Sequence, residues 1–81
     1  DYVKIYTAKE MLLKKKTMSF YEQSLDPSQF VRVHRSYIVQ LSQITRIEPL
    51  EKETHLALLK SGAKVPLSKT GYAKLKTVLG L

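Results

Sequence analysis

The sequence predicts a mostly β domain with one or two short helices. Short segments in which apolar and polar residues alternate recur along the chain, separated by clusters of Gly, Pro, Asp and Ser. With 81 residues, 43% of them hydrophobic, residues 1–81 are expected to form a single domain with a small core. The chain contains no cysteine, which excludes a disulfide framework and a cysteine-based zinc site.

Two strands are expected at the start of the chain. Residues 2–6 (Tyr-Val-Lys-Ile-Tyr) alternate in period two and are rich in residues that favour strands. A turn at residues 8–10 lets residues 11–15 return as a second strand, which ends in the lysine run of residues 14–16.

A short helix is expected next. Ser19 and Glu22 have the spacing of a capping box, which predicts a helix over roughly residues 19–24. Asp26 followed by Pro27 indicates a second helix start or a turn.

The centre of the chain contains two strand pieces and a bend. Residues 30–33 and 37–41 both alternate between apolar and polar side chains, but the alternation breaks between them. We therefore expect a bend or short loop at residues 34–36 (His-Arg-Ser). Residues 44–48 predict a further strand.

A hairpin and a helix are expected in the last third. Residues 55–59 and 64–67 flank a turn at Gly62, and Pro66 indicates an edge strand. Ser68 can cap a helix that Gly80 ends. Three apolar residues recur at helical spacing within it: Tyr72, Leu75 and Leu79. Gly71 is expected to weaken this helix by about 1 kcal/mol relative to alanine.

The net charge of +7 favours a polyanionic partner. Nucleic acid is the first candidate, with an anionic membrane surface or an acidic protein as alternatives. No acidic residue lies between Asp26 and Glu48, and none follows Glu53. A fold that brings these two windows together would have one basic face.

The sequence indicates no enzyme chemistry. His34 and His55 do not have metal-ligand spacing, and His55 lies in an apolar strand where a structural role is expected. There is no Gly-rich phosphate loop, no nucleophile elbow and no paired set of carboxylates. No apolar run approaches the roughly 18 residues of a membrane span. We therefore expect no catalytic site, no metal, no cofactor and no membrane partner.

Three basic segments could contact a polyanion. Residues 34–36 combine a ring donor, a guanidinium fork and a hydroxyl, which suit phosphates and base edges. Residues 68–70 lie at a helix start, where backbone N–H groups attract anions. Residues 14–16 could add phosphate contacts or protect a sheet edge. Each segment also has a plainer interpretation, as solvated side chains or an ordinary helix cap.

Residues 30–39 (Phe-Val-Arg-Val-His-Arg-Ser-Tyr-Ile-Val) resemble the central signature of the LytTR DNA-binding family. Residues 60–62 and 65–69 resemble its glycine-turn hairpin and the segment that follows, and residues 1–3 resemble its first DNA-facing loop. The resemblance covers essentially the whole chain. It implies packed antiparallel sheets of the LytTR type with short helices.

The resemblance also implies a function. It implies a bacterial, cytoplasmic transcription regulator: the output domain of a two-component response regulator, with a receiver domain on the same full-length chain. Its partner would be double-stranded DNA with paired direct repeats, bound through loops in successive major grooves, with a possible homodimer on DNA. The implied base contacts are Arg35 and Lys69. The expected backbone contacts are His34, Ser36, Ser68 and Lys64. A weaker DNA-facing loop would contain Asp1 and Tyr2.

Three departures from the family pattern matter. Lys69 stands where the family usually has arginine, which favours a single or phosphate contact over bidentate base reading. Gln40 stands where asparagine is usual, with little expected consequence. The chain begins where the family already has a strand behind it, so we expect the first strand to be missing and a sheet edge to be unpaired.

The expected function is sequence-specific binding of double-stranded DNA for transcriptional regulation. One alternative is an RNA- or single-strand-binding β module, which would stack bases on exposed tyrosines such as Tyr2 and Tyr6. The other is a protein-interaction domain whose basic surface meets an acidic partner.

Overall fold

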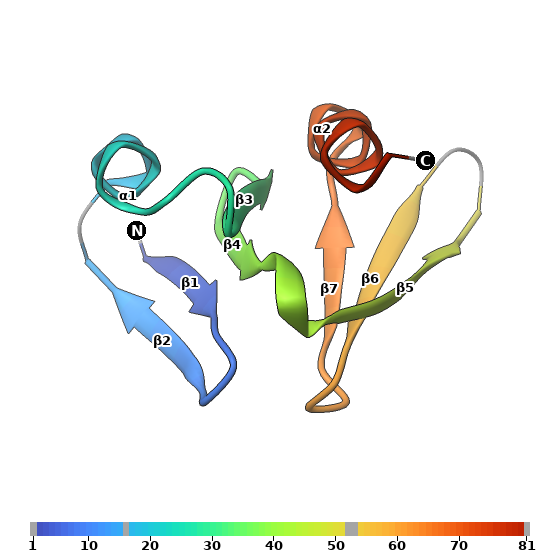
Figure 1. Ribbon diagram of the computed structural model, residues 1–81, viewed down its shortest axis with the longest axis horizontal. Coiled ribbons are helices and arrows are strands. Elements are labelled where there is room, and N and C mark those ends of the chain that lie inside the picture. Colours follow the sequence, from blue (N-terminus) through green and yellow to red (C-terminus); the bar gives the residue numbers. More distant parts are fainter. Residues whose placement is uncertain (1, 16, 52–53, 81) are drawn as a thin grey trace.

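The computed structural model describes residues 2–15, 17–51 and 54–80. Within them the elements in chain order are β1 (Val3–Tyr6), β2 (Met11–Lys14), α1 (Met18–Ser24), β3 (Phe30–His34), β4 (Tyr37–Gln40), the 3₁₀ turn η1 (Leu41–Gln43), β5 (Ile44–Pro49), β6 (His55–Leu59), β7 (Lys64–Leu67) and α2 (Lys69–Leu79). They form a four-stranded sheet in the order β2-β1-β4-β3 and a three-stranded sheet in the order β5-β6-β7. Figure 1 shows the two sheets side by side, joined through η1, with α1 beside the first and α2 beside the second. The expected mostly β fold class with two short helices is confirmed.

One strand pair differs from the expected antiparallel arrangement. β1 runs parallel to β4, with Lys4 opposite Tyr37 and Ile5 opposite Ile38. Parallel neighbours need a long crossover connection, which β2, α1 and β3 supply here. The parallel pairing places the start of β1 beside the turn between β3 and β4.

Helix α1 uses a different cap from the one expected. The side-chain oxygen of Thr17 accepts a hydrogen bond from the backbone N–H of Phe20 at 3.2 Å. The capping box of Ser19 and Glu22 is therefore wrong, since both residues lie inside the helix. Thr17 has the same capping chemistry, and starting the helix there places Met18 in the core.

The segment at Asp26 and Pro27 forms a turn, one of the two alternatives expected from the sequence. Oδ1 of Asp26 accepts hydrogen bonds from the hydroxyl of Ser28 at 2.7 Å and from its backbone N–H at 2.9 Å. These bonds lower the pKa of the Asp26 carboxyl. The turn leads the chain from α1 into β3.

Two clusters of buried side chains hold these elements together. The larger lies between β3 and β4 on one side and β6, β7 and α2 on the other: Val31, Val33, Val39, Ala57, Leu59, Val65, Leu67 and Leu75. The smaller lies between α1 and the first sheet: Val3, Ile5, Met18 and Ile38. Burial of each large aliphatic side chain contributes about 1.5–3 kcal/mol. Packing therefore fixes the short helices more than their intrinsic propensity does.

Helix α2 has the expected caps. Ser68 accepts from the backbone N–H of Gly71 at 2.9 Å, and Gly80 closes the helix with a φ of 75°. Of the three apolar residues at helical spacing, Leu75 is fully buried, whereas Leu79 is 40% exposed. Tyr72 is half-buried and stacks on His55, with 3.6 Å between ring centroids, which gives His55 a structural contact.

Gly71 allows a close contact that the sequence pattern did not predict. A Cβ atom at this position would lie 2.0 Å from the carbonyl oxygen of Val33. The helix can therefore approach β3 this closely only because residue 71 has no side chain. The propensity cost of about 1 kcal/mol stays a prediction for the helix taken alone, and the close contact with β3 gives a structural reason for glycine at this position.

The hairpin of β6 and β7 is confirmed, as is the edge position of Pro66 in β7. Gly62 adopts a φ of 92° in its turn, a conformation that favours glycine. Gln40 lies at the end of β4, as expected. Its Oε1 accepts a hydrogen bond from the backbone N–H of Ala8 at 2.8 Å, which ties the end of β4 to the turn between β1 and β2.

Candidate nucleic-acid interface

The turn between β3 and β4 carries His34, Arg35 and Ser36. The turn lies at residues 35–36, within the expected bend, and the pairing register of β3 and β4 shifts just before it, between Arg32 and His34. Arg35 is exposed, whereas His34 and Ser36 are half-buried. The backbone N–H of Ser36 donates to Nδ1 of His34 at 3.2 Å, which ties the imidazole to its own turn.

This hydrogen bond sets the chemistry of His34. Because Nδ1 accepts, the neutral ring carries its proton on Nε2. The pKa of His34 is lowered, mainly by burial and then by the positive charges of Arg35 and Arg32. At neutral pH the side chain is therefore an uncharged Nε2–H donor, which suits a phosphate oxygen.

Acidification is expected to destabilise the domain through His34. Its folded-state pKa lies below the ordinary 6.5, so the unfolded chain takes up the proton first. The stability that the neutral His34 side chain contributes is fully present above the pKa of the unfolded state. It is lost as the pH falls through the lower pKa of the folded state. Thermal melts at about pH 7.5 and about pH 5.5 measure the loss. His34→Asn keeps an acceptor for the Ser36 N–H and removes the titrating imidazole, so on acidification its melting temperature should fall less than that of the wild type. An equal fall in both proteins would show that His34 is not the group responsible.

Tyr37 connects this turn to β1. Its ring centroid lies 4.8 Å from that of His34 and 6.3 Å from that of Tyr6. Nζ of Lys4 lies 5.7 Å from the Tyr37 centroid, and the Lys4 backbone N–H donates to the Ser36 carbonyl at 2.9 Å. Lys4 thus lies at the turn, although it was absent from the sequence candidates. The alternation of apolar and polar residues predicts only that Lys4 is a polar residue of a strand. The parallel pairing of β1 with β4 shows that it lies beside this turn.

The start of α2 lies against the end of β3, next to this turn. The backbone N–H of Ser68 donates to the Val33 carbonyl at 2.9 Å, and the Ser68 hydroxyl donates to that carbonyl at 3.4 Å while capping the helix. The Ser68 hydroxyl is therefore engaged in joining α2 to β3. Lys69 and Thr70, which follow it, are exposed.

The described parts of the three basic segments identified in the sequence therefore lie toward one end of the molecule. Lys16 lies outside the described residues. Lys14 pairs with Val3 at the start of β1, so the lysines that end β2 belong to this end as well. We call this surface the basic end. Its members are Lys4, Lys14, Lys15, His34, Arg35, Ser36 and Lys69.

Other candidates fall outside this cluster. Lys64 is the first residue of β7, whereas the basic end adjoins Ser68, which follows the last residue of that strand, Leu67. The length of β7 therefore separates Lys64 from the basic end by about 10 Å. Lys64 is exposed beside the hairpin turn. Tyr2, in contrast, directly precedes β1 and is 50% exposed, so it adjoins the basic end without being counted among its members. Asp1 lies outside the described residues.

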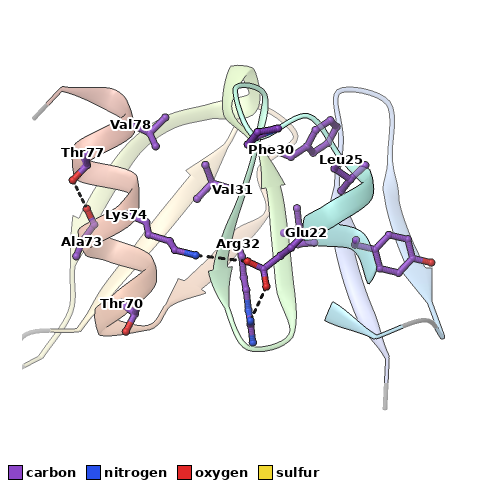
Figure 2. A pocket seen from close by; sticks show the side chains of 13 residues that line it. Glu22, Leu25, Phe30, Val31, Arg32, Thr70, Ala73, Lys74, Thr77 and Val78 are labelled. Atoms are coloured by element: carbon purple, nitrogen blue, oxygen red, sulfur yellow. Dashed lines mark hydrogen bonds and ion pairs between the residues drawn. The ribbon is translucent and has the colours of Figure 1, made fainter. Parts of the chain in front are cut away.

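Two further cations are held in ion pairs. A groove of about 520 Å³ lies between α1 and α2 over β3. Figure 2 shows Glu22 reaching across it toward Arg32 and Lys74. Glu22 lies 2.8 Å from Arg32 and 3.7 Å from Lys74, so the fold already provides both cations with a carboxylate.

Two kinds of feature are absent from the described residues. Residues 2–15, 17–51 and 54–80 contain no group of three or more His, Cys, Asp or Glu placed to hold a metal ion. None of their helices combines the length and apolar character needed to cross a membrane.

A strand-rich domain that gathers exposed cations and neutral donors at one end has the surface of a polyanion-binding module. The chain belongs to the LytTr DNA-binding domain family, which it matches over residues 1–80. It is thus a DNA-binding domain of the kind found in response regulators and transcriptional regulators.

Individual relatives agree with the family. The chain is 36% identical over 77 residues to the sensory transduction protein LytT of Bacillus anthracis and 27% identical over 77 residues to the transcriptional regulatory protein LytR of Staphylococcus aureus (strain N315). Each match covers 95% of this chain but only 31% of the relative, so the chain spans about a third of these proteins. The fold matches the LytTr domain of a putative methyl-accepting/DNA response regulator from Bacillus cereus, with a TM-score of 0.75, 22% identity and coverage of 99% and 97% of the two chains.

Proposed function

We propose that this domain binds double-stranded DNA sequence-specifically, as the output domain of a two-component response regulator in the bacterial cytoplasm. The observation that supports this most is the basic end, where segments from β1, the turn between β3 and β4, and the start of α2 converge. The receiver domain would lie elsewhere on the full-length chain. Two copies would occupy paired direct repeats.

Each residue of the basic end has a proposed role. Arg35, which is exposed on the turn, would contact a base edge through its guanidinium fork. Nε2–H of His34 and the hydroxyl of Ser36 would bind phosphate oxygens. Lys69 would make a second contact near the bases, and its single ammonium favours one hydrogen bond or a phosphate. Ser68 would position Lys69 by capping α2.

The direct test is selection from a pool of random duplexes with purified domain. Enrichment of a short motif is expected, and competition with single-stranded DNA and with RNA should displace little bound protein. A folded domain that enriches no duplex sequence at any salt concentration would favour the protein-interaction alternative. Preferential displacement by single strands would favour the stacking alternative, for which Tyr2 is the most exposed aromatic beside the basic end.

Lys4 is expected to contribute a non-specific phosphate contact. The logarithm of the affinity should fall with the logarithm of salt concentration by about 0.9 per phosphate neutralised. Lys4→Ala should weaken binding to all sequences alike and reduce this slope by about 1. Titrations of duplex DNA with the wild type and with Lys4→Ala at several salt concentrations measure both slopes.

Lys64→Ala is the matched control for this measurement. Lys64 carries the same charge but lies at the far end of β7, so its removal should leave the slope nearly unchanged. If Lys64→Ala reduced the slope as much as Lys4→Ala does, the DNA-facing surface would have to extend along β7, and the earlier expectation for Lys64 would hold.

A further inference from the structure

The outer edge of β2 has no strand beside it. Within the described residues, β2 pairs only with β1 and ends the first sheet, as Figure 1 shows. Met11 and Leu13 of this strand are 44% and 52% exposed. An unpaired edge with exposed apolar side chains is a template for another strand.

The hydrogen bonds of β1 show which backbone groups of β2 point outward. Lys4 donates its N–H to Ser36 of β4, so the residue opposite it in β2, Leu13, has its backbone groups on the outer edge. Thr7 donates to the carbonyl of Glu10, which therefore points inward. Alternation then places the N–H and C=O of Met11 and Leu13 outward, and those of Leu12 inward.

We infer that β2 pairs antiparallel with β2 of a second copy of this chain, about a two-fold axis at Leu12. In this register Met11 of one copy lies opposite Leu13 of the other, so their outward N–H and C=O groups can bond reciprocally. Because the axis is perpendicular to the sheet, directly opposed residues share a face. Met11 and Leu13 would therefore cover each other on one face of a continuous sheet.

Charge complementarity selects this register. It places Glu10 of each copy opposite Lys14 of the other, giving two opposite-charge pairs, while Leu12 meets Leu12 on the axis. A shift of two residues in either direction would put lysine opposite Met11 or Leu13 instead. Lys9 and Lys15 would also be opposed, but Lys9 lies two residues before the strand, whereas Glu10 directly precedes it and its opposite residue Lys14 is within it. With so short an edge, the interface falls below the size of stable dimers, so we expect weak association.

The pairing has a consequence that rests on the proposed function. Lys14 lies at the basic end and Glu10 lies away from it, so antiparallel pairing points the two basic ends in opposite directions. The pair would join two separate DNA segments. Copies on adjacent direct repeats of one duplex face the same way and could not use this contact.

Sedimentation equilibrium of the purified domain, over a range reaching millimolar concentration, tests the association. The mean mass is expected to rise from the monomer value of 9.3 kDa toward twice that value. Glu10→Lys and Lys14→Glu should each weaken association by roughly tenfold, because like charges would then face each other in both symmetric pairs. The double variant should restore it. A constant monomer mass, or association unaffected by either reversal, would overturn the inference.

Cross-linking provides a second, independent readout. The chain has no cysteine, so Leu12→Cys introduces a unique thiol that faces its symmetry mate across a pair without hydrogen bonds. Mild oxidation should yield a disulfide-linked dimer faster than for Val78→Cys, a control at an exposed position of α2. Equal rates would count against pairing at β2.

Capture of a free labelled duplex by an immobilised duplex tests the orientation. The wild-type domain should bridge the two, and Glu10→Lys should not. Intact self-association without bridging, in a domain that binds duplex DNA, would show that the inferred antiparallel orientation is wrong. Loss of DNA binding altogether would instead overturn the proposed function and leave the self-association data standing.

Discussion

Replacement of Gly71 by alanine is expected to destabilise the domain by about 3 kcal/mol or more. The added Cβ would lie 2.0 Å from the Val33 carbonyl oxygen, which no side-chain adjustment can relieve, because both partners belong to the backbone. Helix α2 would have to move off β3, which disrupts the Ser68–Val33 hydrogen bonds and the packing of Leu75. Urea denaturation followed by circular dichroism measures the change.

Ala73→Gly is the control for this prediction. Ala73 lies two residues further along the same helix at an exposed position, so glycine there should cost only the intrinsic propensity of about 1 kcal/mol. On helix propensity alone Gly71→Ala would stabilise the domain by a similar amount. A Gly71→Ala variant as stable as the wild type would mean that α2 does not approach β3 this closely.

Arg35→Ala is expected to cause the largest loss of DNA recognition by a single exposed side chain. A bidentate arginine–base contact contributes about 1–3 kcal/mol of discrimination, which corresponds to roughly 5–150-fold in affinity for the preferred site. Selection repeated with the variant should enrich the same motif with one position relaxed. Binding to unrelated duplexes should fall much less.

The matched control is Arg46→Ala. Arg46 is also an exposed arginine, but it lies on β5 of the second sheet, paired with Glu48 at 2.6 Å. Its loss should leave the motif unchanged and lower affinity only slightly. If Arg35→Ala weakened all sequences uniformly, Arg35 would be a phosphate contact, and base reading would have to come from elsewhere on the basic end.

The amino-acid sequence by itself determined most of the local structure. Period-two alternation located the strands, and the break in alternation located the turn that exposes Arg35. Glycine and capping chemistry located the Gly62 turn and both ends of α2. These features depend on residues close together in the chain, so pattern and propensity suffice to predict them. Where neighbouring residues offered the same chemistry, as Thr17 and Ser19 do, local pattern chose the wrong cap.

The tertiary structure alone decided how these pieces meet. The parallel pairing of β1 with β4 brings Lys4 to the Ser36 turn, across 32 residues of sequence, and no periodicity specifies the partner of a strand. Close packing of α2 on β3 explains why glycine stands at position 71 and brings Ser68, which precedes Lys69, to the Val33 carbonyl. It also left Lys64, equally basic in sequence, at the opposite end of its strand. Composition determined that the surface would be cationic, but the long-range burial of apolar side chains decided which cations lie together.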